Sequence, residues 1–531
     1  MRRLQLCLYN HVLLPLRGRH PGPPGSGIKS YKKAVRAARA EDCPSINITP
    51  VDKATKEAWD VILAANDVSS SAEFLFRHGD QPCRLEHADD GHLVPRVLTQ
   101  DRLVYRLNDI AWWEKTIKEG THRVRLVPID IVKNVLATPD PPLPILDRIV
   151  EVPVLAPDGS IHDKPGYSAK THVWYEPNPE LTIPPLSKRR PTKEEVKRAK
   201  DLILEEVFGE FPFVSEADKA HMLCVVLQPI VRDLISGPTP LYVPQAPTTG
   251  TGKGLLVKVT GLIINGREIP AMAEGGSEEE WRKRITSTLL RAPEVVLLDN
   301  LQAKLDSAAF SALLTSELWE DRKLGHTENL TLKNRATWIA TGNNPKFSDE
   351  IIRRVIRIRI DSGKEHPEDR TFRKGDLEGW VREHRGELIW AALTLARAWI
   401  CAGRPVPAGQ RLLGSFEGWS RVMGGILQVA GVPGFLGNLD DMRESAGTER
   451  DDMLPVLITW HDQHKGRAIR TKDLGDDLLV LLGVDPTHKD TAHRIAGKKI
   501  SQYEDRPFGD YVLRRGAERG KVATWYVQKL R

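Results

Sequence analysis

The chain has 531 residues, of which 40% are hydrophobic and 28% are charged. This composition is typical of a globular protein with room for three or four domains. No run of about 18 apolar residues occurs, so the sequence predicts no membrane-spanning helix and no membrane partner. The five cysteines are scattered without a C-x-x-C pair, which argues against a disulfide scaffold or a cysteine-based zinc site and favours the reducing cytoplasm.

The net charge of +6 conceals an uneven distribution. Residues 1–40 hold nine Lys/Arg and no acid, residues 489–531 hold eleven Lys/Arg and five acids, and residues 41–488 therefore carry −9. Basic ends favour a polyanionic partner, although solvated tails would give the same count.

Residues 1–50 are expected to form a flexible basic arm. Two arginines precede an apolar run, as in a signal peptide, but Asn10 and His11 interrupt that run and no A-x-A-like cleavage site follows. Secretion is therefore not predicted.

Residues 51–190 predict an α+β accessory domain. Alternating apolar residues favour short strands at 104–107, 123–127 and 172–175. No paired carboxylates of the primase-polymerase type occur here, and we assign no chemistry to this part of the chain.

A helix over 191–208 with Thr192 as its N-cap, and a second over 222–234, predict the entry to a domain spanning 191–405. A short strand then runs into the loop Q-A-P-T-T-G-T-G-K-G and a helix over 255–264. This arrangement cradles phosphates, because glycines turn backbone N–H groups toward the anion, the helix N-terminus adds positive potential and the lysine reaches the β- and γ-phosphates.

The phosphate-loop motif G-x-x-x-x-G-K-[ST] is matched imperfectly. Pro247 stands at the first glycine, and Gly254 replaces the Ser/Thr whose hydroxyl binds Mg²⁺. A tight strand-to-helix turn is the alternative interpretation of the tetrapeptide alone.

Two later strands support the nucleotide interpretation. An apolar run ends in Asp299 and Asn300, and a second ends at Asn343, after which Arg353 and Arg354 open a further strand. Each strand alone is typical of a buried core, but their order and spacing favour an ATPase, in which the strand-terminal aspartate would hold Mg²⁺.

The segment from about 240 to 360 resembles an AAA+ ATPase core. More narrowly, it is similar to the helicase-like ATPases of phages, plasmids and integrated elements that are related to MCM and superfamily-three helicases. The matching phrases are A-P-T-T-G-T-G-K-G-L-L, E-E-W-R-K-R-I, V-V-L-L-D-N, L-W-E-D-R-K-L-G, A-T-G-N-N-P and I-I-R-R-V-I-R-I-R-I. A weaker likeness extends over most of residues 70–430.

This resemblance implies specific roles for the motif residues. Lys253 would bind ATP phosphates within a loop that also includes Gly250, Thr251, Gly252 and Gly254. Asp299 would hold Mg²⁺ and Asn343 would be the sensor that positions water or the γ-phosphate. Arg353 or Arg354 would complete a neighbouring subunit's site, which implies self-association as a hexameric ring.

Two departures from the AAA+ pattern mean that the sequence does not predict the rate of ATP hydrolysis. Gly254 offers no Mg²⁺ ligand, so Thr249, Thr251 or water would have to substitute. Asn300 stands where many AAA+ enzymes place a glutamate, and an amide can orient water without accepting its proton.

A hairpin is predicted over 318–333. In the related helicases a hairpin here projects into the channel of the ring, so the resemblance makes Lys323, His326 and Lys333 DNA contacts. A surface hairpin with solvated charges is the alternative. The helix that Ser277 caps is assigned a structural role only.

Residues 375–404 are expected to form a helical lid on the ATPase core, and residues 406–449 a connector. The segment 450–531 predicts three helices (451–464, 471–482 and 491–504) and a hairpin, and it resembles a winged-helix DNA-binding domain. Ile495 is assigned to the apolar stripe of the third helix. The predicted DNA contacts are Arg494 and Lys498 on that helix and Arg514, Arg515, Arg519 and Lys521 on the wing. A protein-interaction module with a basic surface is the alternative.

The sequence therefore predicts an α/β protein, with a P-loop AAA+ parallel sheet between an α+β accessory domain and a C-terminal winged helix. The expected function is that of an ATP- and Mg²⁺-dependent DNA helicase or translocase in the replication of a phage or mobile element. It would act on single-stranded or forked DNA, with a separate primase or polymerase as a partner. An ATP-switched replication initiator or loader is the alternative, and a protein-remodelling AAA+ machine is the third candidate.

Overall fold

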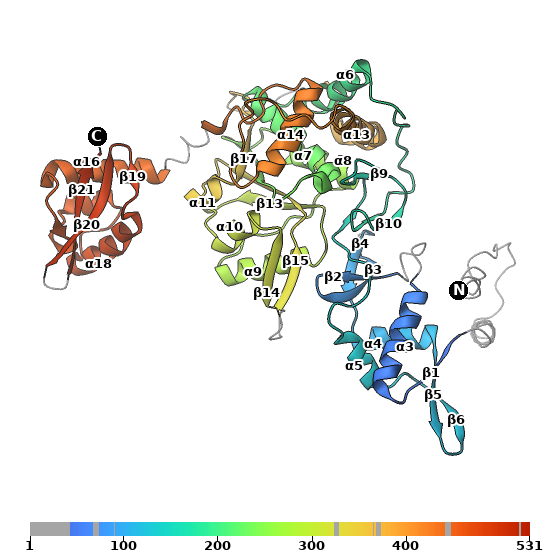
Figure 1. Cartoon of the computed structure of the whole chain (residues 1–531). Coiled ribbons are helices and arrows are strands. Elements are labelled where there is room, and N and C mark those ends of the chain that lie inside the picture. The colour runs from blue at the N-terminus through green and yellow to red at the C-terminus, as the bar shows by residue number, and fades with distance from the viewer. Residues whose placement is uncertain are drawn as a thin grey trace, which may run out of the picture. The chain divides into compact units, whose positions relative to one another are not determined.

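The computed structural model describes residues 43–66, 74–89, 91–322, 329–364, 366–367, 373–440, 448–519 and 522–530. The basic arm predicted at the N-terminus lies almost wholly outside these residues. The chain divides into two compact units (Figure 1). The first comprises residues 1–303, 307–345 and 354–436, and the second comprises residues 304–306, 346–353 and 437–531. Within the described ranges, no helix combines the length and apolarity needed to cross a bilayer.

The N-terminal part of the first unit mixes helices with small sheets. Helices α3 (Val51–Ala64), α4 (Gln100–Ile110) and α5 (Ile129–Leu136) share a core with strands β1 (Ser45–Asn47) and β5 (Trp112–Ile117), and β6 (Gly120–Val124) pairs with β5. A second sheet contains β2 (Leu75–His78), β3 (Gln81–His87) and β4 (Leu93–Val97). A third contains β7 (Arg148–Val150), β10 (Gly166–Ser168) and β11 (Val173–Tyr175), while β8 (Val154–Leu155) pairs with β9 (Ile161–His162).

One predicted strand in this region is wrong. Residues 104–107 belong to helix α4, because Thr99 caps its N-terminus by accepting a hydrogen bond from the Arg102 backbone N–H. The buried residues Leu103 and Leu107 are four apart. This spacing fits one face of a helix and also one face of a strand, so a run of four residues does not distinguish the two. The strand predicted at 172–175 is confirmed as β11.

A four-stranded parallel sheet forms the centre of the first unit. Its strand order is β13 (Val295–Leu301), β16 (Thr337–Asn343), β12 (Leu241–Ala246) and β17 (Val355–Arg359). The strands are nearly continuous apolar runs, as expected for a parallel sheet covered on both faces. At the centre, the Tyr242 hydroxyl donates to Gln228 Oε1 at 2.8 Å and accepts from Trp419 Nε1 at 2.8 Å.

Helices pack around this sheet and against one another (Figure 1). They are α6 (Lys193–Asp201), a π-helix at Leu202–Val207, α7 (Glu216–Val231), α8 (Lys253–Asn265), α9 (Glu278–Leu289) and α10 (Ala308–Leu314), followed by α12 (Leu377–Glu383), α13 (Arg385–Cys401) and α14 (Glu417–Ala430). Thr192 caps α6 with a complete capping box, as predicted, and Ser277 caps α9. The helical segment predicted at 375–404 is confirmed as α12 and α13.

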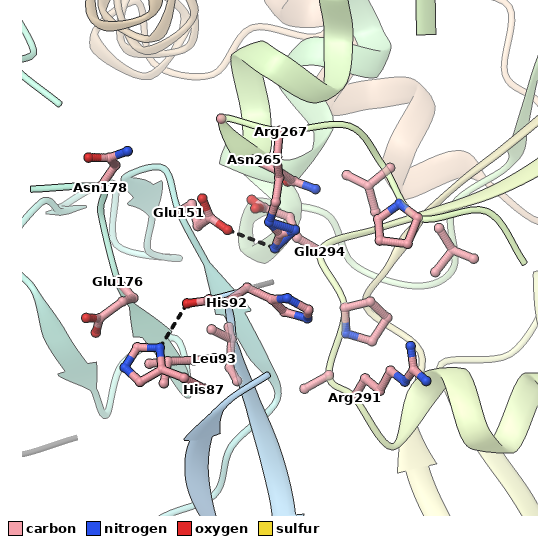
Figure 2. A pocket seen from close by; sticks show the side chains of 18 of the residues that line it. His87, His92, Leu93, Glu151, Glu176, Asn178, Asn265, Arg267, Arg291 and Glu294 are labelled. Atoms are coloured by element: carbon pink, nitrogen blue, oxygen red, sulfur yellow. Dashed lines mark hydrogen bonds and ion pairs between the residues drawn. The ribbon is translucent and has the colours of Figure 1, made fainter. Parts of the chain in front are cut away.

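A cleft of about 660 Å³ lies beside the start of strand β13 (Figure 2). Its walls come from the β3–β4 hairpin, from the chain around Glu151 and Asn178, from the end of α8 and from the segment between α9 and β13. The most buried polar residues of its lining are Asn265 and Glu294, which are 7% and 5% exposed.

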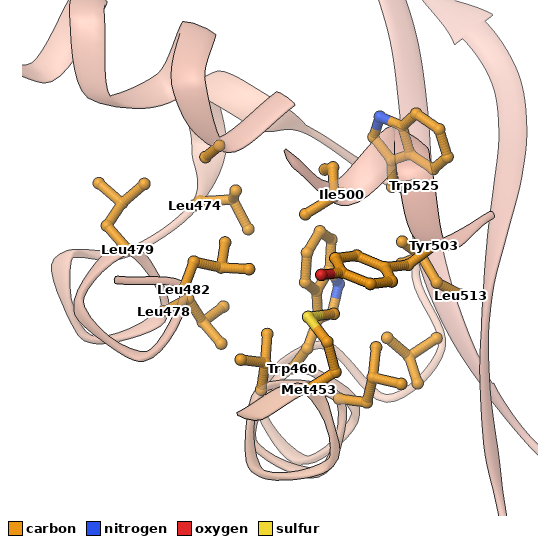
Figure 3. Packing of buried hydrophobic residues seen from close by; sticks show 14 of the residues in the cluster. Met453, Trp460, Leu474, Leu478, Leu479, Leu482, Ile500, Tyr503, Leu513 and Trp525 are labelled. Carbon is orange, nitrogen blue, oxygen red and sulfur yellow. The ribbon is translucent and has the colours of Figure 1, made fainter. Parts of the chain in front are cut away.

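The second unit consists mainly of a small C-terminal module. It contains α16 (Thr448–His464), α17 (Asp476–Leu481) and α18 (Lys489–Ile500), with a sheet in the order β18 (Ile469–Arg470), β21 (Val522–Lys529), β20 (Tyr511–Arg519) and β19 (Pro507–Phe508). Trp460, Leu478 and Ile500, one from each helix, pack with Leu513 and Trp525 of the hairpin (Figure 3).

The predicted order of three helices and a hairpin is confirmed in this module. The second helix begins later than predicted, at Asp476, because residues Thr471–Asp473 form a separate 3-10 turn. Ile495 was assigned to the apolar stripe and is 47% exposed, so that assignment is wrong.

Candidate nucleotide site and nucleic-acid surfaces

The glycine loop joins β12 to α8 as the sequence predicts. Gly250 and Gly252 have φ angles of +76° and +105°, and Gly252 is the N-cap of α8. An L side chain rarely adopts such angles, although a Cβ at Gly252 would make only an ordinary contact, at 3.5 Å, with the ring of Phe211. The loop therefore depends on glycine to turn the chain into the helix, whose unpaired N–H groups and dipole favour an anion.

Thr251 has no free hydroxyl to offer Mg²⁺. The residue is 2% exposed, and its Oγ1 donates to the Thr248 carbonyl at 2.9 Å. Gly254 is exposed, and a Cβ added there would meet no atom within 4 Å. The missing hydroxyl is thus not supplied by Thr251, although there is space for a side chain at Gly254.

Lys253 and Asn343 come together at the mouth of the loop. Lys253 Nζ donates to Asn343 Oδ1 at 2.5 Å, because β16, which ends in Asn343, lies next to β12. Partial burial lowers the pKa of Lys253, while the charge of Asp299 opposes that shift. Two residues 90 positions apart in the sequence thus form one polar cluster.

Asp299 and Asn300 lie exposed near the end of β13. Thr341 Oγ1 donates to Asp299 Oδ1 at 2.6 Å and accepts from the Asn300 backbone N–H at 2.7 Å. Asn300 has a φ of +54°, so the chain turns sharply at this point. Sequence reasoning missed Thr341, although its place two residues before Asn343 on a predicted strand was a usable signal.

The two arginines of the predicted finger differ in their surroundings. Arg354 immediately precedes β17 and its guanidinium donates to the Ser311 hydroxyl. Arg353 is exposed, and its Nε donates to the Asp349 carbonyl at 2.9 Å. Arg353 is therefore the more accessible of the two.

The hairpin predicted over 318–333 is confirmed as strands β14 (Leu318–Arg322) and β15 (Asn329–Lys333). Lys323 and His326 lie outside the described residues. Lys333 pairs with Leu318 at the base of the hairpin, and its Nζ is 2.9 Å from Asp147 Oδ2. This ion pair gives Lys333 a bracing contact that the sequence did not predict.

Asp147 is one of several carboxylates that contact or belong to the hairpin. Burial opposes ionisation of Asp147, but hydrogen bonds from His172 and Lys333 lower its pKa overall. Asp80 Oδ2 accepts from the Thr331 backbone N–H at 3.3 Å. On β14, Asp321 accepts from Arg282 Nη2 at 2.8 Å and from Thr286 Oγ1 at 3.0 Å. Helix α9 and the N-terminal part of the unit therefore both contact the hairpin.

The basic residues of the C-terminal module are only partly available. Arg494 and Lys498 are exposed on α18, and Arg515 is exposed on β20. Arg514 pairs with Asp505 at 2.6 Å. The side chain of Arg519 and the whole of Lys521 lie outside the described residues.

Comparisons with known proteins add a coarse likeness. No family model matches the chain, and no curated protein matches it. Similar solved structures include the apo A form of the NrS-1 C-terminal region, with 14% identity over 67% of this chain and 79% of that one and a TM-score of 0.33. They also include the SCCmec type IV Cch active helicase, with 12% identity over 85% and 91% and a TM-score of 0.33. JCV helicase shares 16% identity over 45% and 67%, with a TM-score of 0.20.

Two of these three structures are named as helicases. The identities and TM-scores are too low for this likeness to assign a function to the chain.

Proposed function

We propose that the chain is an ATP-dependent DNA helicase or translocase with a P-loop AAA+ core that acts in the replication of a phage or other mobile element. One observation carries the proposal. Lys253, Asn343, Thr341 and Asp299 gather at the carboxyl ends of three adjacent parallel strands, beside a glycine loop that opens a helix. Ligands of open α/β sheets bind at this edge.

ATP would place its phosphates over the glycine loop and draw Lys253 away from Asn343. Lys253 then neutralises phosphate charge, and the released Asn343 amide orients the γ-phosphate or the attacking water. Asp299 is an exposed carboxylate near the end of β13, a hard oxygen ligand of the kind Mg²⁺ takes while keeping several waters. Bound Mg²⁺ would neutralise charge on the phosphate oxygens.

Hydrolysis is proposed to be slow in the absence of DNA. The Asn300 side chain can hold a water but cannot take its proton, and Gly254 gives Mg²⁺ no hydroxyl ligand. Arg353 of a neighbouring subunit would supply transition-state charge, which requires a ring, and a hexamer is the proposed form.

DNA would contact two parts of the chain. The hairpin over 318–333 is proposed to enter the channel of the ring, and Lys323 and His326 are proposed to contact DNA there. The C-terminal module is proposed to act as a winged helix, with α18 in the major groove and the β20–β21 hairpin on phosphates. A separate primase or polymerase would use the separated strands.

The decisive experiment is strand displacement on forked DNA with and without ATP, using the full chain and a Lys253→Ala variant. We expect ATP-dependent unwinding and DNA-stimulated ATP hydrolysis by the wild type, and loss of both in the variant. DNA-stimulated ATPase activity that is absent, or unchanged by Lys253→Ala, would exclude the motor.

The second candidate function is an ATP-switched replication initiator or loader. Gly254 and Asn300 favour it, because both weaken the hydrolytic site. The same assay separates the two functions: ATP-dependent DNA binding without unwinding identifies the initiator.

A further inference from the structure

We propose that Glu274 accepts the proton of the attacking water in ATP hydrolysis, the step that the Asn300 amide cannot perform. The inference rests on the proposed ATPase function and assigns it one further catalytic residue. Three observations support it: an extended segment that pairs with β13, a contact between Glu274 and the turn that follows Asn300, and a carboxylate oxygen that water reaches.

The chain between α8 and α9 adds a short extended segment to the central sheet. Ala271 forms a parallel bridge with Leu297 of β13, and the Met272 backbone N–H donates to the Leu297 carbonyl at 2.7 Å. The segment therefore runs in the same direction as β13, toward the carboxyl ends of the parallel strands. Glu274 and Asn300 each lie three residues beyond this bridge, so Glu274 lies beside the end of β13 that carries Asn300.

A hydrogen bond holds the Glu274 carboxylate at this end of the sheet. Its Oε1 accepts from the Gln302 backbone N–H at 2.8 Å, although the two residues are 28 positions apart in the sequence. The Gln302 side chain in turn donates from Nε2 to the Asn300 carbonyl at 3.2 Å. Neighbouring strands lie about 4.8 Å apart, so one water can bridge the Glu274 carboxylate and the Asn300 side chain.

The second carboxylate oxygen of Glu274 is open to water. The residue is half-buried, and Oε2 forms no hydrogen bond with any residue in the part of the chain that the structure describes. This oxygen is not one of the buried side-chain atoms that lack a partner, so it is in contact with solvent. A carboxylate with one oxygen held and the other open can take a proton from a water molecule.

The acidic residues closest in the sequence to Asn300 and to Glu274 have other roles. Asp299 is the proposed ligand of Mg²⁺, and its charge is needed on the metal. Glu278 accepts from two backbone N–H groups at the start of α10, at 3.1 and 2.9 Å. Neither carboxylate is therefore available to take the proton.

The proposed step is a displacement by water at the γ-phosphorus. Asn300 orients the water, and Glu274 takes one of its protons while the water oxygen forms a bond to phosphorus. The bond between that phosphorus and the β–γ bridging oxygen breaks, and the bridging oxygen keeps the electron pair as part of ADP. The proton then passes from Glu274 to solvent, which restores the carboxylate.

The test compares the ATPase kinetics of the full chain and of Glu274→Gln in the presence of forked DNA. Glutamine keeps an acceptor for the Gln302 N–H and cannot take a proton. We expect kcat to fall about a hundredfold or more, with the KM for ATP and the affinity for a non-hydrolysable ATP analogue unchanged. Glu279→Gln is the matched control, since it removes an exposed carboxylate that pairs with Lys283 on α9, and it should keep the wild-type kcat.

A second pair of variants separates proton transfer from an effect on the turn. Glu274→Asp and Glu274→Asn have side chains of equal length, and only the first carries a carboxylate. We expect kcat to be about tenfold or more higher in Glu274→Asp than in Glu274→Asn. Equal kcat values in this pair would overturn the proposed proton transfer.

The kinetics also separate this inference from the proposed function. A wild-type kcat in Glu274→Gln overturns the role of Glu274 and leaves the ATPase intact. A fall in kcat that is matched by a loss of affinity for the ATP analogue makes Glu274 a nucleotide-binding residue and overturns its role in proton transfer. ATP hydrolysis that is absent from the wild type overturns both the proposed function and this inference.

Discussion

Gly254 is a single residue on which the rate of the proposed ATPase depends. It is exposed near the start of α8 and has open space around its Cβ position. A threonine there would fit without displacing a neighbour and would restore the hydroxyl that the phosphate-loop motif places on Mg²⁺.

We therefore expect Gly254→Thr to raise Mg²⁺-dependent ATP affinity or turnover several-fold. Gly254→Ala is the matched control, since it adds the Cβ without the hydroxyl and should leave the Mg²⁺ dependence unchanged. ATPase rates measured across a Mg²⁺ titration would check this. Equal effects of Thr and Ala would show that the backbone, and not metal coordination, limits the site.

The raised pKa of Glu294, which is due to burial, predicts that the stability of the fold depends on pH. Its folded-state pKa of about 8 is above the value of about 4.3 expected in the unfolded chain. The folded state therefore holds the proton more tightly, and the stability due to Glu294 declines as pH rises from about 4 to 8 and is lost above 8.

Glu294→Gln has no proton to lose at this position. As pH rises from 5 to 9, the melting temperature of the variant should therefore increase relative to that of the wild type. Thermal unfolding at a series of pH values measures this difference. Parallel curves for the two proteins would contradict the assigned protonation.

At the scale of elements, the β14–β15 hairpin is held by contacts at its base, where Lys333 lies, and near the other end of its described strands, where Asp321 pairs with Leu330. Lys333 reaches Asp147, and Arg282 of α9 reaches Asp321. Asp147 is only 9% exposed, so removing its lysine leaves a carboxylate that water reaches poorly. Such contacts restrict how the hairpin can move relative to the N-terminal part of the unit.

A double-mutant cycle between Lys333→Met and Asp147→Asn should give a coupling energy of about 1 kcal/mol or more in denaturant unfolding. The matched cycle uses the exposed pair Lys197 and Asp201 of α6, for which about 0.5 kcal/mol or less is expected. Indistinguishable coupling energies would mean that Lys333 does not brace the hairpin.

Individual elements also show how far the sequence could predict the fold. The helix after the glycine loop and the β14–β15 hairpin were predictable, because glycine positions and turn residues act locally. The prediction of a strand at 104–107 was wrong because a run of four residues fits both the helical and the strand periodicity. The contacts of Lys333 and Thr341 were not predictable, since each depends on a partner that only the tertiary fold brings near.

At the scale of the whole molecule, the positive charge of the C-terminal segment has defined positions. Arg494 and Lys498 are exposed on one helix of a module with its own core. If they contact phosphates, each contributes to the release of counterions from DNA, and binding weakens as salt rises.

The variant Arg494→Ala with Lys498→Ala should weaken DNA binding and reduce the slope of log K against log salt by about 2. Lys465→Ala removes an exposed lysine that directly follows α16 and serves as the control, with an unchanged slope. Fluorescence anisotropy over a salt series measures both. A slope that is identical in the double variant would argue for the protein-interaction alternative.

Helix α8 and strand β13 each have one end at the phosphate loop and the other at the cleft. A ligand that shifts either element on binding at one end changes the free energy of binding at the other. Thermodynamic linkage makes that effect reciprocal, so the factor by which a ligand of the cleft changes ATP affinity must equal the factor by which ATP changes the affinity for that ligand.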